Sequence, residues 1–436
     1  MRIYEAKNAQ SRAHFRAGEV NTPTLTGTGN IAVVLGLSFL AAACSPIQAP
    51  LRRARQVTAL DAPPVANLNR SCPSVYVPAW DYFPDKVTFD HSTQLKVTYY
   101  DHYKIVDFVP SILQKLPLRY VLYQCGTPRP QGFEGATFLE VPLQRAVLNS
   151  PVMGSTVEAL GVIDRLYGVN DLDQYTVPSI VKAGEGGRIH SLGTRSSSSI
   201  ELATTIDTDA VFLFYSANPI YNLHPALRRL GVGAVAVGDS FESTPLGRAE
   251  WSKFFALLFN EERRANQQFA RSTEQYNALA SRARQERHKP IVLLGFAWTR
   301  DVWTASGGRN HYAKLVEDAG GQYFLADDSH PAANLRMPFE KAVYESEGAP
   351  IWFAHNGLSR IPSKAAFLRK MPLFSQLFTM QHGRVFALDS RAGDGEAIPA
   401  EDSSLNQPEK MLADFVSVLH PELLPGYQPV FIRELP

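Results

Sequence analysis

The chain has 436 residues, with 43 Lys and Arg against 42 Asp and Glu, and 45% of its residues are apolar. This length accommodates two or three units with a core, and the apolar content excludes a disordered chain. The formal net charge is +1, whereas nucleic-acid-binding domains usually carry a clear excess of basic residues. We therefore expect no nucleic-acid partner. The 3 Cys and the scattered His show no spacing typical of a metal site, and we expect neither a protein-held metal nor a resident cofactor.

The amino terminus has the pattern of an export leader. Basic residues precede an uncharged apolar run from Ile31 to Leu40, which is followed by Ala-Ala-Ala-Cys44. This run is too short to span a bilayer as a helix but fits the apolar region of a signal peptide. We predict that residues 1–43 are a lipoprotein signal peptide and that Cys44 is the lipidated first residue of the mature chain. The alternative is an ordinary signal peptide with a chance cysteine.

This leader predicts an exported, membrane-anchored lipoprotein that faces the periplasm or the cell surface and touches the membrane through its lipid only. Residues 45–70 are rich in Pro, Ala, Arg and Asn without periodicity, which is typical of a tether, and we assign residues 44–84 to this tether. Cys72 and Cys125 form an even pair in an oxidising compartment, so we expect a disulfide between them. Two separately buried thiols are the alternative.

Residues 85–136 are predicted to form a small β-rich extension. Their runs of alternating β-branched and aromatic residues favour strands; these runs are Lys86–Asp90, Leu95–Tyr100, Tyr103–Phe108 and Tyr120–Tyr123.

From residue 137 onward the pattern is α/β. Short apolar runs separated by helix-length segments favour a mainly parallel sheet covered by helices; these runs are Thr137–Val141, Ala210–Phe214, Ala234–Val237, Ile291–Leu294, Ile351–Phe353 and Val385–Leu388. A helical pattern over residues 244–289 opens with Thr244-Pro245, a typical N-cap and first-turn proline. Because about forty residues is long for one helix, we expect it to connect two Rossmann-like lobes, residues 137–243 and 290–436.

The order of these features resembles the iron-complex and cobalamin class of periplasmic substrate-binding proteins of ABC importers, in a subgroup with an amino-terminal extension. The resemblance covers residues 85–436 and rests on several local matches: Leu160-Gly-Val-Ile-Asp-Arg-Leu-Tyr-Gly-Val169, Ser199-Ile-Glu-Leu202, Thr244-Pro-Leu-Gly-Arg-Ala-Glu-Trp251, Asp318-Ala-Gly-Gly321 and Leu419-His-Pro-Glu-Leu423. It implies capture of an iron chelate (siderophore-like) or a corrinoid between the lobes, followed by delivery to the transmembrane subunits of an ABC permease.

Ligands of such sheets bind beyond the carboxyl ends of the strands. The loops expected there concentrate Trp, Tyr, Arg and His; the candidate ligand-binding residues are Met153, Arg195, Tyr215, Trp298, Trp303, His355 and Arg391. Aromatic faces suit macrocycles and aromatic chelators, and Arg suits anionic iron complexes.

The resemblance also implies that Glu201 and Glu340 dock on arginines of the permease, one from each lobe. Each lies near the start of a helix before an apolar strand, where an acidic residue also complements the helix dipole, and that role is the alternative. The sequence has no G-x-S-x-G, Walker or H-E-x-x-H motif, so we expect no enzyme. An exported α/β hydrolase and a non-transport surface lipoprotein are the alternative functions.

Overall fold

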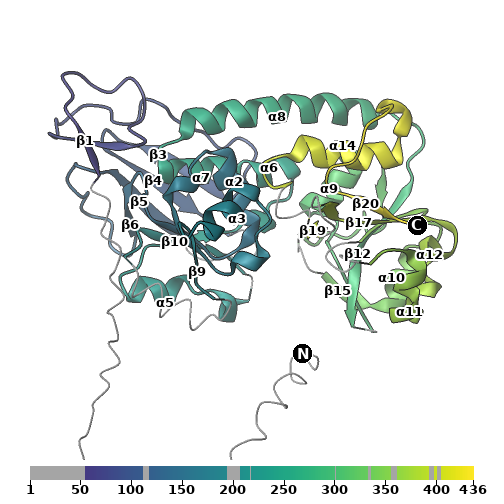
Figure 1. Cartoon of the computed structure of the whole chain (residues 1–436). Coiled ribbons are helices and arrows are strands. Elements are labelled where there is room, and N and C mark those ends of the chain that lie inside the picture. The colour runs from purple at the N-terminus through teal and green to yellow at the C-terminus, as the bar shows by residue number, and fades with distance from the viewer. Residues whose placement is uncertain are drawn as a thin grey trace, which may run out of the picture. The chain divides into compact units, whose positions relative to one another are not determined.

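The computed structural model describes residues 55–110, 117–193, 207–216, 218–299, 301–331, 335–354, 361–391, 397–399 and 404–436. The predicted leader and Cys44 lie outside these residues. The predicted class is confirmed: the described chain is α/β, with two lobes, each built on a sheet flanked by helices (Figure 1). The amino-terminal sheet is parallel and the carboxy-terminal sheet is mixed. Among the described residues, no helix is both long and apolar enough to cross a membrane.

The extension contains a four-stranded sheet of order β3-β4-β5-β6. Its strands are β3 (Leu95–Tyr99), β4 (Tyr103–Phe108), β5 (Leu118–Gln124) and β6 (Thr137–Val141). The first three match predicted strands, whereas Lys86–Asp90 is not a strand. We assigned β6 to the amino-terminal lobe, but it pairs in parallel with β5. Buried and partly exposed side chains alternate along β6, as expected for a strand at the edge of a sheet with one face covered.

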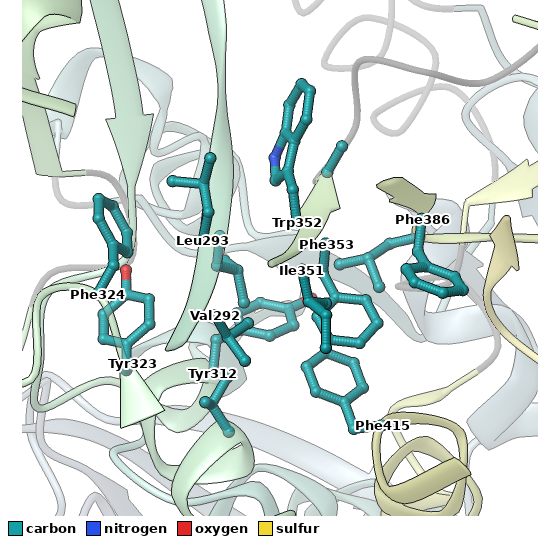
Figure 2. Close-up of a cluster of buried hydrophobic side chains, with 14 of the residues drawn as sticks. Val292, Leu293, Tyr312, Tyr323, Phe324, Ile351, Trp352, Phe353, Phe386 and Phe415 are labelled. Carbon is teal, nitrogen blue, oxygen red and sulfur yellow. The ribbon is translucent and has the colours of Figure 1, made fainter. Parts of the chain in front are cut away.

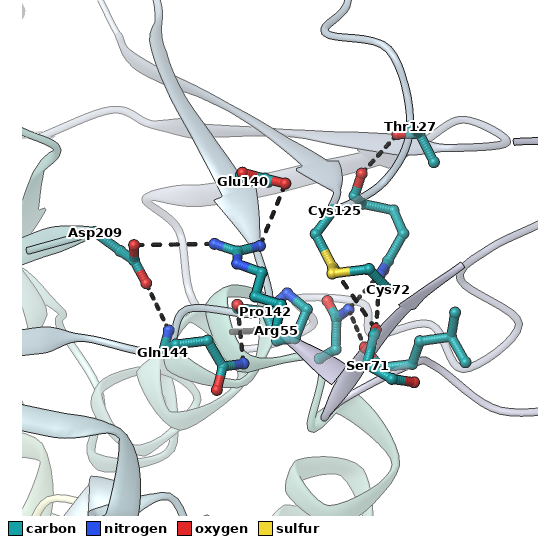
Figure 3. Close-up of polar contacts among 12 residues, drawn as sticks. Arg55, Ser71, Cys72, Cys125, Thr127, Glu140, Pro142, Gln144 and Asp209 are labelled. Carbon is teal, nitrogen blue, oxygen red and sulfur yellow. Dashed lines mark hydrogen bonds and ion pairs between the residues drawn. A yellow bond between two sulfur atoms is a disulfide. The ribbon is translucent and has the colours of Figure 1, made fainter. Parts of the chain in front are cut away.

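The segment before this sheet is packed, which corrects the prediction of a tether that continues to residue 84. Strands β1 (Gln56–Thr58) and β2 (Ser71–Pro73) pair in parallel, and Tyr82 and Phe83 are fully buried. A disulfide joins Cys72 to Cys125 (Figure 3). Burial of large aromatic rings stabilises this segment although its sequence shows no periodicity.

Arg55, the first described residue, forms ion pairs with the extension sheet and the amino-terminal lobe. Its guanidinium lies 3.4 Å from the carboxylate of Glu140 and 3.9 Å from that of Asp209, as Figure 3 shows. Asp209 also accepts the backbone N–H of Gln144 at 2.7 Å. The extension and the amino-terminal lobe therefore share one polar cluster.

The amino-terminal lobe has a five-stranded parallel sheet of order β11-β10-β7-β8-β9. Its strands are β7 (Ala146–Leu148), β8 (Leu166–Val169), β9 (His190–Ser191), β10 (Ala210–Phe214) and β11 (Ala234–Val237). Its helices are α2 (Gly154–Ala159), α3 (Pro178–Glu185) and α5 (His224–Arg229), with 3-10 turns at Pro151–Met153, Ile163–Arg165, Leu172–Gln174, Pro219–Tyr221 and Asp239–Phe241. The chain moves from β7 outward through β8 and β9, then returns to the other side of β7 as β10. The strand order therefore reverses between β7 and β10.

The carboxy-terminal lobe is built around the parallel strands β14-β12-β16-β17, with antiparallel strands added beside them. The strands are β12 (Ile291–Thr299), β13 (Val302–Ala305), β14 (Gln322–Tyr323), β15 (Leu335–Pro338), β16 (Ile351–Ala354), β17 (Arg384–Ala387) and β20 (Arg433–Leu435), with a separate hairpin of β18 (Asp389–Arg391) and β19 (Ala397–Pro399). The helices are α9 (His311–Asp318), α10 (Phe339–Glu345), α11 (Lys364–Lys370), α12 (Phe378–His382) and α14 (Pro408–Leu419), with 3-10 turns at Pro372–Gln376 and Pro421–Leu423.

Figure 2 shows the core of this lobe, where side chains of β12 and β16 meet rings from the flanking helices. The rings of Phe353 and Phe415 stack with centroids 3.9 Å apart. This contact packs α14 against one face of the sheet.

We predicted one helix between the lobes, but the segment forms three: α6 (Pro245–Ala249), α7 (Trp251–Phe259) and α8 (Glu262–Ala283). Asn260 ends α7 with a left-handed backbone (φ 58°), a conformation that Asn adopts more readily than most residues. Its side-chain amide donates to the carbonyl of Leu68 and to Gln124, each at 2.9 Å. Contacts with the extension therefore support the break.

Helix α8 is the element that connects the lobes. Near its start, Ala265 packs in the core of the amino-terminal lobe. Near its end, Tyr276, Ala280 and Ala283 pack in the core of the carboxy-terminal lobe. Helix α7 is buried along its whole length and belongs to the amino-terminal lobe.

Candidate ligand-binding region

The strand orders define one candidate ligand-binding position in each lobe. In an open α/β sheet, ligands bind beyond the carboxyl ends of the strands, where the strand order reverses. In the amino-terminal lobe this position lies after β7 and β10, at Ser150 and Ser216. In the carboxy-terminal lobe it lies after β12 and β16.

An exposed apolar cluster occupies this position in the amino-terminal lobe. Phe214, the last residue of β10, is 45% exposed, and Ile220 and Tyr221 in the following 3-10 turn are 75% and 66% exposed. Water-facing side chains of this size, gathered within eight residues, are typical of a binding surface. We call Phe214, Ile220 and Tyr221 the β10 cluster.

Local hydrogen bonds hold the loop that carries the β10 cluster. Asn218 caps the 3-10 turn by accepting the backbone N–H of Ile220 at 3.2 Å. Asn222 accepts the backbone N–H of Ser216 and donates to its carbonyl, both at 2.8 Å. These bonds hold Ser216 and the 3-10 turn that carries Ile220 and Tyr221 in place before binding, which lowers the entropy cost of binding.

Three of the predicted ligand-binding residues are core residues instead. Met153, Tyr215 and Trp303 are 2%, 4% and 0% exposed. The Tyr215 ring meets Phe108 edge-on with centroids 5.3 Å apart, and burial raises the pKa of its hydroxyl. These side chains lack the free surface that a ligand contact requires.

Trp303 is buried because of its place in the β12–β13 hairpin. Its indole N–H donates to the carbonyl of Leu294 at 3.3 Å, and that of Trp352 donates to the carbonyl of Gly295 at 2.9 Å. Gly295 has φ 118°, and a Cβ there would lie 2.7 Å from the Trp303 indole nitrogen. The glycine therefore lets the ring pack over the strand, and Trp303 and Trp352 both belong to the core of the lobe.

The other predicted residues are only partly described. Arg195, Glu201 and His355 lie outside the described residues. Trp298 lies in β12 and Arg391 in β18, but their side chains are not among those described. Their roles stay predictions.

Glu340 lies in the first turn of α10 and is exposed. Helix α10 precedes β16, as the resemblance implied for a docking carboxylate. This position is open to a partner protein and also complements the helix dipole.

Sequence reasoning missed Ile220 and Tyr221. We chose residues by aromatic and charged character and considered only Tyr215–Asn218 in this loop. The available signal was the apolar pair directly after Pro219, in a connection where small polar residues are usual.

A cavity of about 800 Å³ lies at the opposite edge of the amino-terminal sheet, where β7 and β8 begin. Four arginines line it: Arg55, Arg70, Arg145 and Arg188. Arg70 pairs with Asp164 at 2.6 Å, and the guanidinium of Arg145 lies 4.0 Å from the ring centroid of Tyr167. These partners account for much of the positive charge, so we assign no ligand to this cavity.

The chain thus has two α/β lobes joined by α8 and an exposed apolar cluster after β10, which is the architecture of a two-lobed protein. The family model described as periplasmic binding protein matches residues 154–392, more than half of the 436 residues. The chain belongs to this family. Its members are binding proteins and not enzymes, which excludes the hydrolase alternative, and they bind small ligands and work with ABC permeases.

Relatives and solved structures agree with this assignment. An uncharacterized lipoprotein of Methanocaldococcus jannaschii is 22% identical over 302 residues, covering 66% of this chain and 68% of the relative. A periplasmic heme binding protein from Pseudomonas aeruginosa has a TM-score of 0.50 at 17% identity, covering 67% of this chain and 98% of its own. The Helicobacter pylori CeuE/Ni-His complex has a TM-score of 0.50 at 18% identity, covering 66% and 87%. The family and the lipoprotein relative indicate an exported protein.

Proposed function

We propose that this protein captures an iron chelate or a corrinoid at the crevice between its lobes and delivers it to an ABC permease, while a lipid on Cys44 anchors it to the membrane. The observation that carries this proposal is the β10 cluster. It places a bare apolar surface where the strand order of the amino-terminal sheet reverses.

The chemistry of the β10 cluster favours a large, partly apolar ligand. A phenol ring and two apolar side chains can cover the face of a macrocycle or an aromatic chelator, but they offer few hydrogen bonds to a sugar or an amino acid. The Pseudomonas protein of similar fold is a heme binding protein, and heme is a metal macrocycle of the same chemical class as a corrinoid. Arg195, Trp298, His355 and Arg391 are the residues we propose for the remaining contacts, with the arginines facing anionic groups.

The proposed delivery step uses the exposed carboxylate of Glu340 and that of the predicted docking residue Glu201, one from each lobe. Arginines on the permease would pair with them. Charge pairs at the rim of an interface mainly set the association rate and the orientation of the partners.

The test is binding of hemin, cobalamin and ferric siderophores to the purified chain, followed by thermal shift and intrinsic Trp fluorescence. A specific ligand raises Tm, because it stabilises the folded state by RT ln(1 + [L]/Kd). Tyr221→Ala and Ile220→Ala should each weaken binding of that ligand by about 1 to 3 kcal/mol, as loss of a buried contact does.

Matched controls use exposed side chains away from the crevice. Tyr344→Ala in α10 removes a ring that is 75% exposed, and Leu230→Ala removes an exposed leucine after α5. Both should leave affinity unchanged. Failure of all three ligand classes to bind, or equal losses in the controls and the cluster variants, would contradict the proposal.

A further inference from the structure

A histidine and two glutamates meet at the amino-terminal edge of the carboxy-terminal sheet, opposite the crevice. Glu286 follows α8, His420 ends α14 and Glu422 lies in the next 3-10 turn. One ring nitrogen and one oxygen of each carboxylate lie within 4.8 Å of one another. His420 is 2% exposed, Glu286 is half-buried and Glu422 is exposed.

One contact determines which ring nitrogen of His420 carries a proton. Nε2 lies 3.1 Å from the carbonyl oxygen of Gly320. A carbonyl only accepts hydrogen bonds, so Nε2 is the donor and Nδ1 faces the glutamates. A metal-binding histidine is usually held in this way, by donation from its other nitrogen to a carbonyl or a carboxylate.

Gly320 makes this contact possible. Its backbone is left-handed (φ 79°), and a Cβ there would lie 2.6 Å from His420 Nε2 and 2.4 Å from the carbonyl oxygen of Ala283. A larger residue would push the ring away. The backbone is therefore shaped to hold the imidazole in one orientation.

The distance from Nδ1 to the Glu422 carboxylate is 3.5 Å. A protonated imidazole bonded to a carboxylate would bring these atoms to about 2.7 to 2.9 Å. Two ligands of a tetrahedral Zn²⁺, each about 2.0 to 2.1 Å from the ion, are separated by about 3.3 Å. The observed spacing leaves room for a cation between the two atoms.

The electrostatics of this region also favour a cation. Helices α8 and α14 both end here, and helix carboxyl termini carry partial negative charge. The neighbouring cations have partners other than the two glutamate carboxylates: Arg282 donates to the carbonyl of Leu423 at 3.0 Å, Arg284 to the carboxylate of Asp318 at 2.8 Å, and Lys289 to the carbonyl of Arg284 at 2.8 Å. Within the described part of the chain, no Lys or Arg lies at ion-pair distance from the Glu286 or Glu422 carboxylate.

We propose that Glu286, His420 and Glu422 bind one divalent cation of the zinc class, with water as a further ligand. One imidazole and two carboxylates form a ligand set that Zn²⁺ accepts. The ion would join the end of the connecting helix α8 to the end of α14. Its role is structural, and it is separate from the cargo that the crevice captures.

The test is Zn²⁺ titration of the full, EDTA-treated protein by isothermal calorimetry and thermal shift. The wild type should bind about one ion and gain a higher Tm, because binding to the folded state alone stabilises it. Co²⁺ should give the visible absorption of a nitrogen- and oxygen-bound ion of low coordination number.

The double variant Glu286→Gln, Glu422→Gln should bind Zn²⁺ at least ~10-fold more weakly. Both residues lie outside the core, so the variant should fold. The matched control is Glu345→Gln, Glu347→Gln, which changes the same charge at exposed positions of the same lobe and should keep wild-type affinity.

Absence of Zn²⁺ binding by the wild type would overturn this site. Unchanged affinity in the Glu286, Glu422 variant would also overturn it, because the ion would then lie elsewhere, for example in the crevice. Ligand binding at the β10 cluster is measured independently, so failure of one assignment leaves the other intact.

Discussion

The buried ion pair between Lys104 and Glu262 offers a sharp test of how the extension is held. Lys104 comes from β4 of the extension and Glu262 from the first turn of α8, and both side chains are 0% exposed. The ammonium donates to the Glu262 carboxylate and, at 2.9 Å, to the Asn260 side chain. This pair therefore joins the extension to the start of the connecting helix.

Burial lowers the pKa of the Lys104 ammonium and raises the pKa of the Glu262 carboxyl, and each partner opposes the shift of the other. Removing one partner leaves the other charge buried and unpaired. Such a change costs about 3 to 5 kcal/mol. We expect a loss of this size in the free energy of unfolding for Lys104→Met and for Glu262→Met.

The double variant Lys104→Met, Glu262→Met should lose much less than the sum of the single variants. No charge is left unpaired, and the main cost is the Asn260 oxygen without its donor, about 1 to 3 kcal/mol. The coupling energy should therefore be at least about 3 kcal/mol, in the direction that favours the pair.

Equilibrium unfolding in urea, followed by circular dichroism, measures these free energies, and hydrogen exchange locates the loss. Protection should fall in β4 and at the start of α8 but not in the carboxy-terminal sheet. A loss below about 1 kcal/mol for either single variant, or additive losses in the double variant, would refute the reasoning.

Three further predictions concern the disulfide, a buried carboxyl and the docking surface. Because the Cys72–Cys125 bridge closes a sequence separation of 53 residues, reduction should lower the free energy of unfolding by about 4 kcal/mol, and Cys72→Ala, Cys125→Ala should lose as much and not respond to reductant. Burial raises the pKa of the Glu242 carboxyl above 4.5, so the stability from this group is complete below pH 4.5 and falls as pH rises through the folded pKa. In Glu242→Gln that decline should disappear, whereas parallel pH–stability curves for variant and wild type would contradict it. Glu201→Lys, Glu340→Lys should keep ligand affinity but impair uptake, and wild-type uptake rates would exclude the docking roles.

The sequence predicted two strands of the amino-terminal sheet well because nearly all of their residues are buried. Ala210–Phe214 and Ala234–Val237 match β10 and β11 residue for residue. A strand covered on both faces needs apolar residues at successive positions, so the apolar run has the same bounds as the strand. Strand β8 was missed because Tyr167 and Gly168 interrupt its apolar pattern.

The helix break at Asn260 could not be predicted from local sequence. No Gly or Pro occurs between Trp251 and Ala283, and Asn is an ordinary surface residue of helices. The contacts that support the left-handed backbone come from Leu68, Lys104 and Gln124, which are distant in the sequence.

The ligand-binding residues were harder to predict because residue type does not determine side-chain direction. Trp303 was chosen as an aromatic loop residue, but the hairpin register places it opposite Ala297 and Met337, and its ring faces the core. Tyr221 faces water because a 3-10 turn follows β10. Short turns and hairpin registers of this kind depend on tertiary packing. The spacing of apolar residues along the sequence does not predict them.

The contacts of the extension converge on the segment that leads from the amino-terminal lobe into α8. Glu250 accepts the backbone N–H groups of Asp90, His91 and Ser92 at 2.7 to 3.0 Å, and Glu242 accepts that of Thr93 at 3.2 Å. These carboxylates lie at the two ends of α6.

These bonds hold the extension against both ends of α6. The carbonyl of Glu242 also lies 3.3 Å from the His311 ring, and Leu246 packs in the core of the carboxy-terminal lobe, so α6 contacts both lobes. Helix α8 itself spans about 33 Å as a single rod of 22 residues. Bending within such a rod is costly, because each turn would lose backbone hydrogen bonds. The contacts of the extension with α6 and with the start of α8 therefore oppose changes in the angle between the lobes.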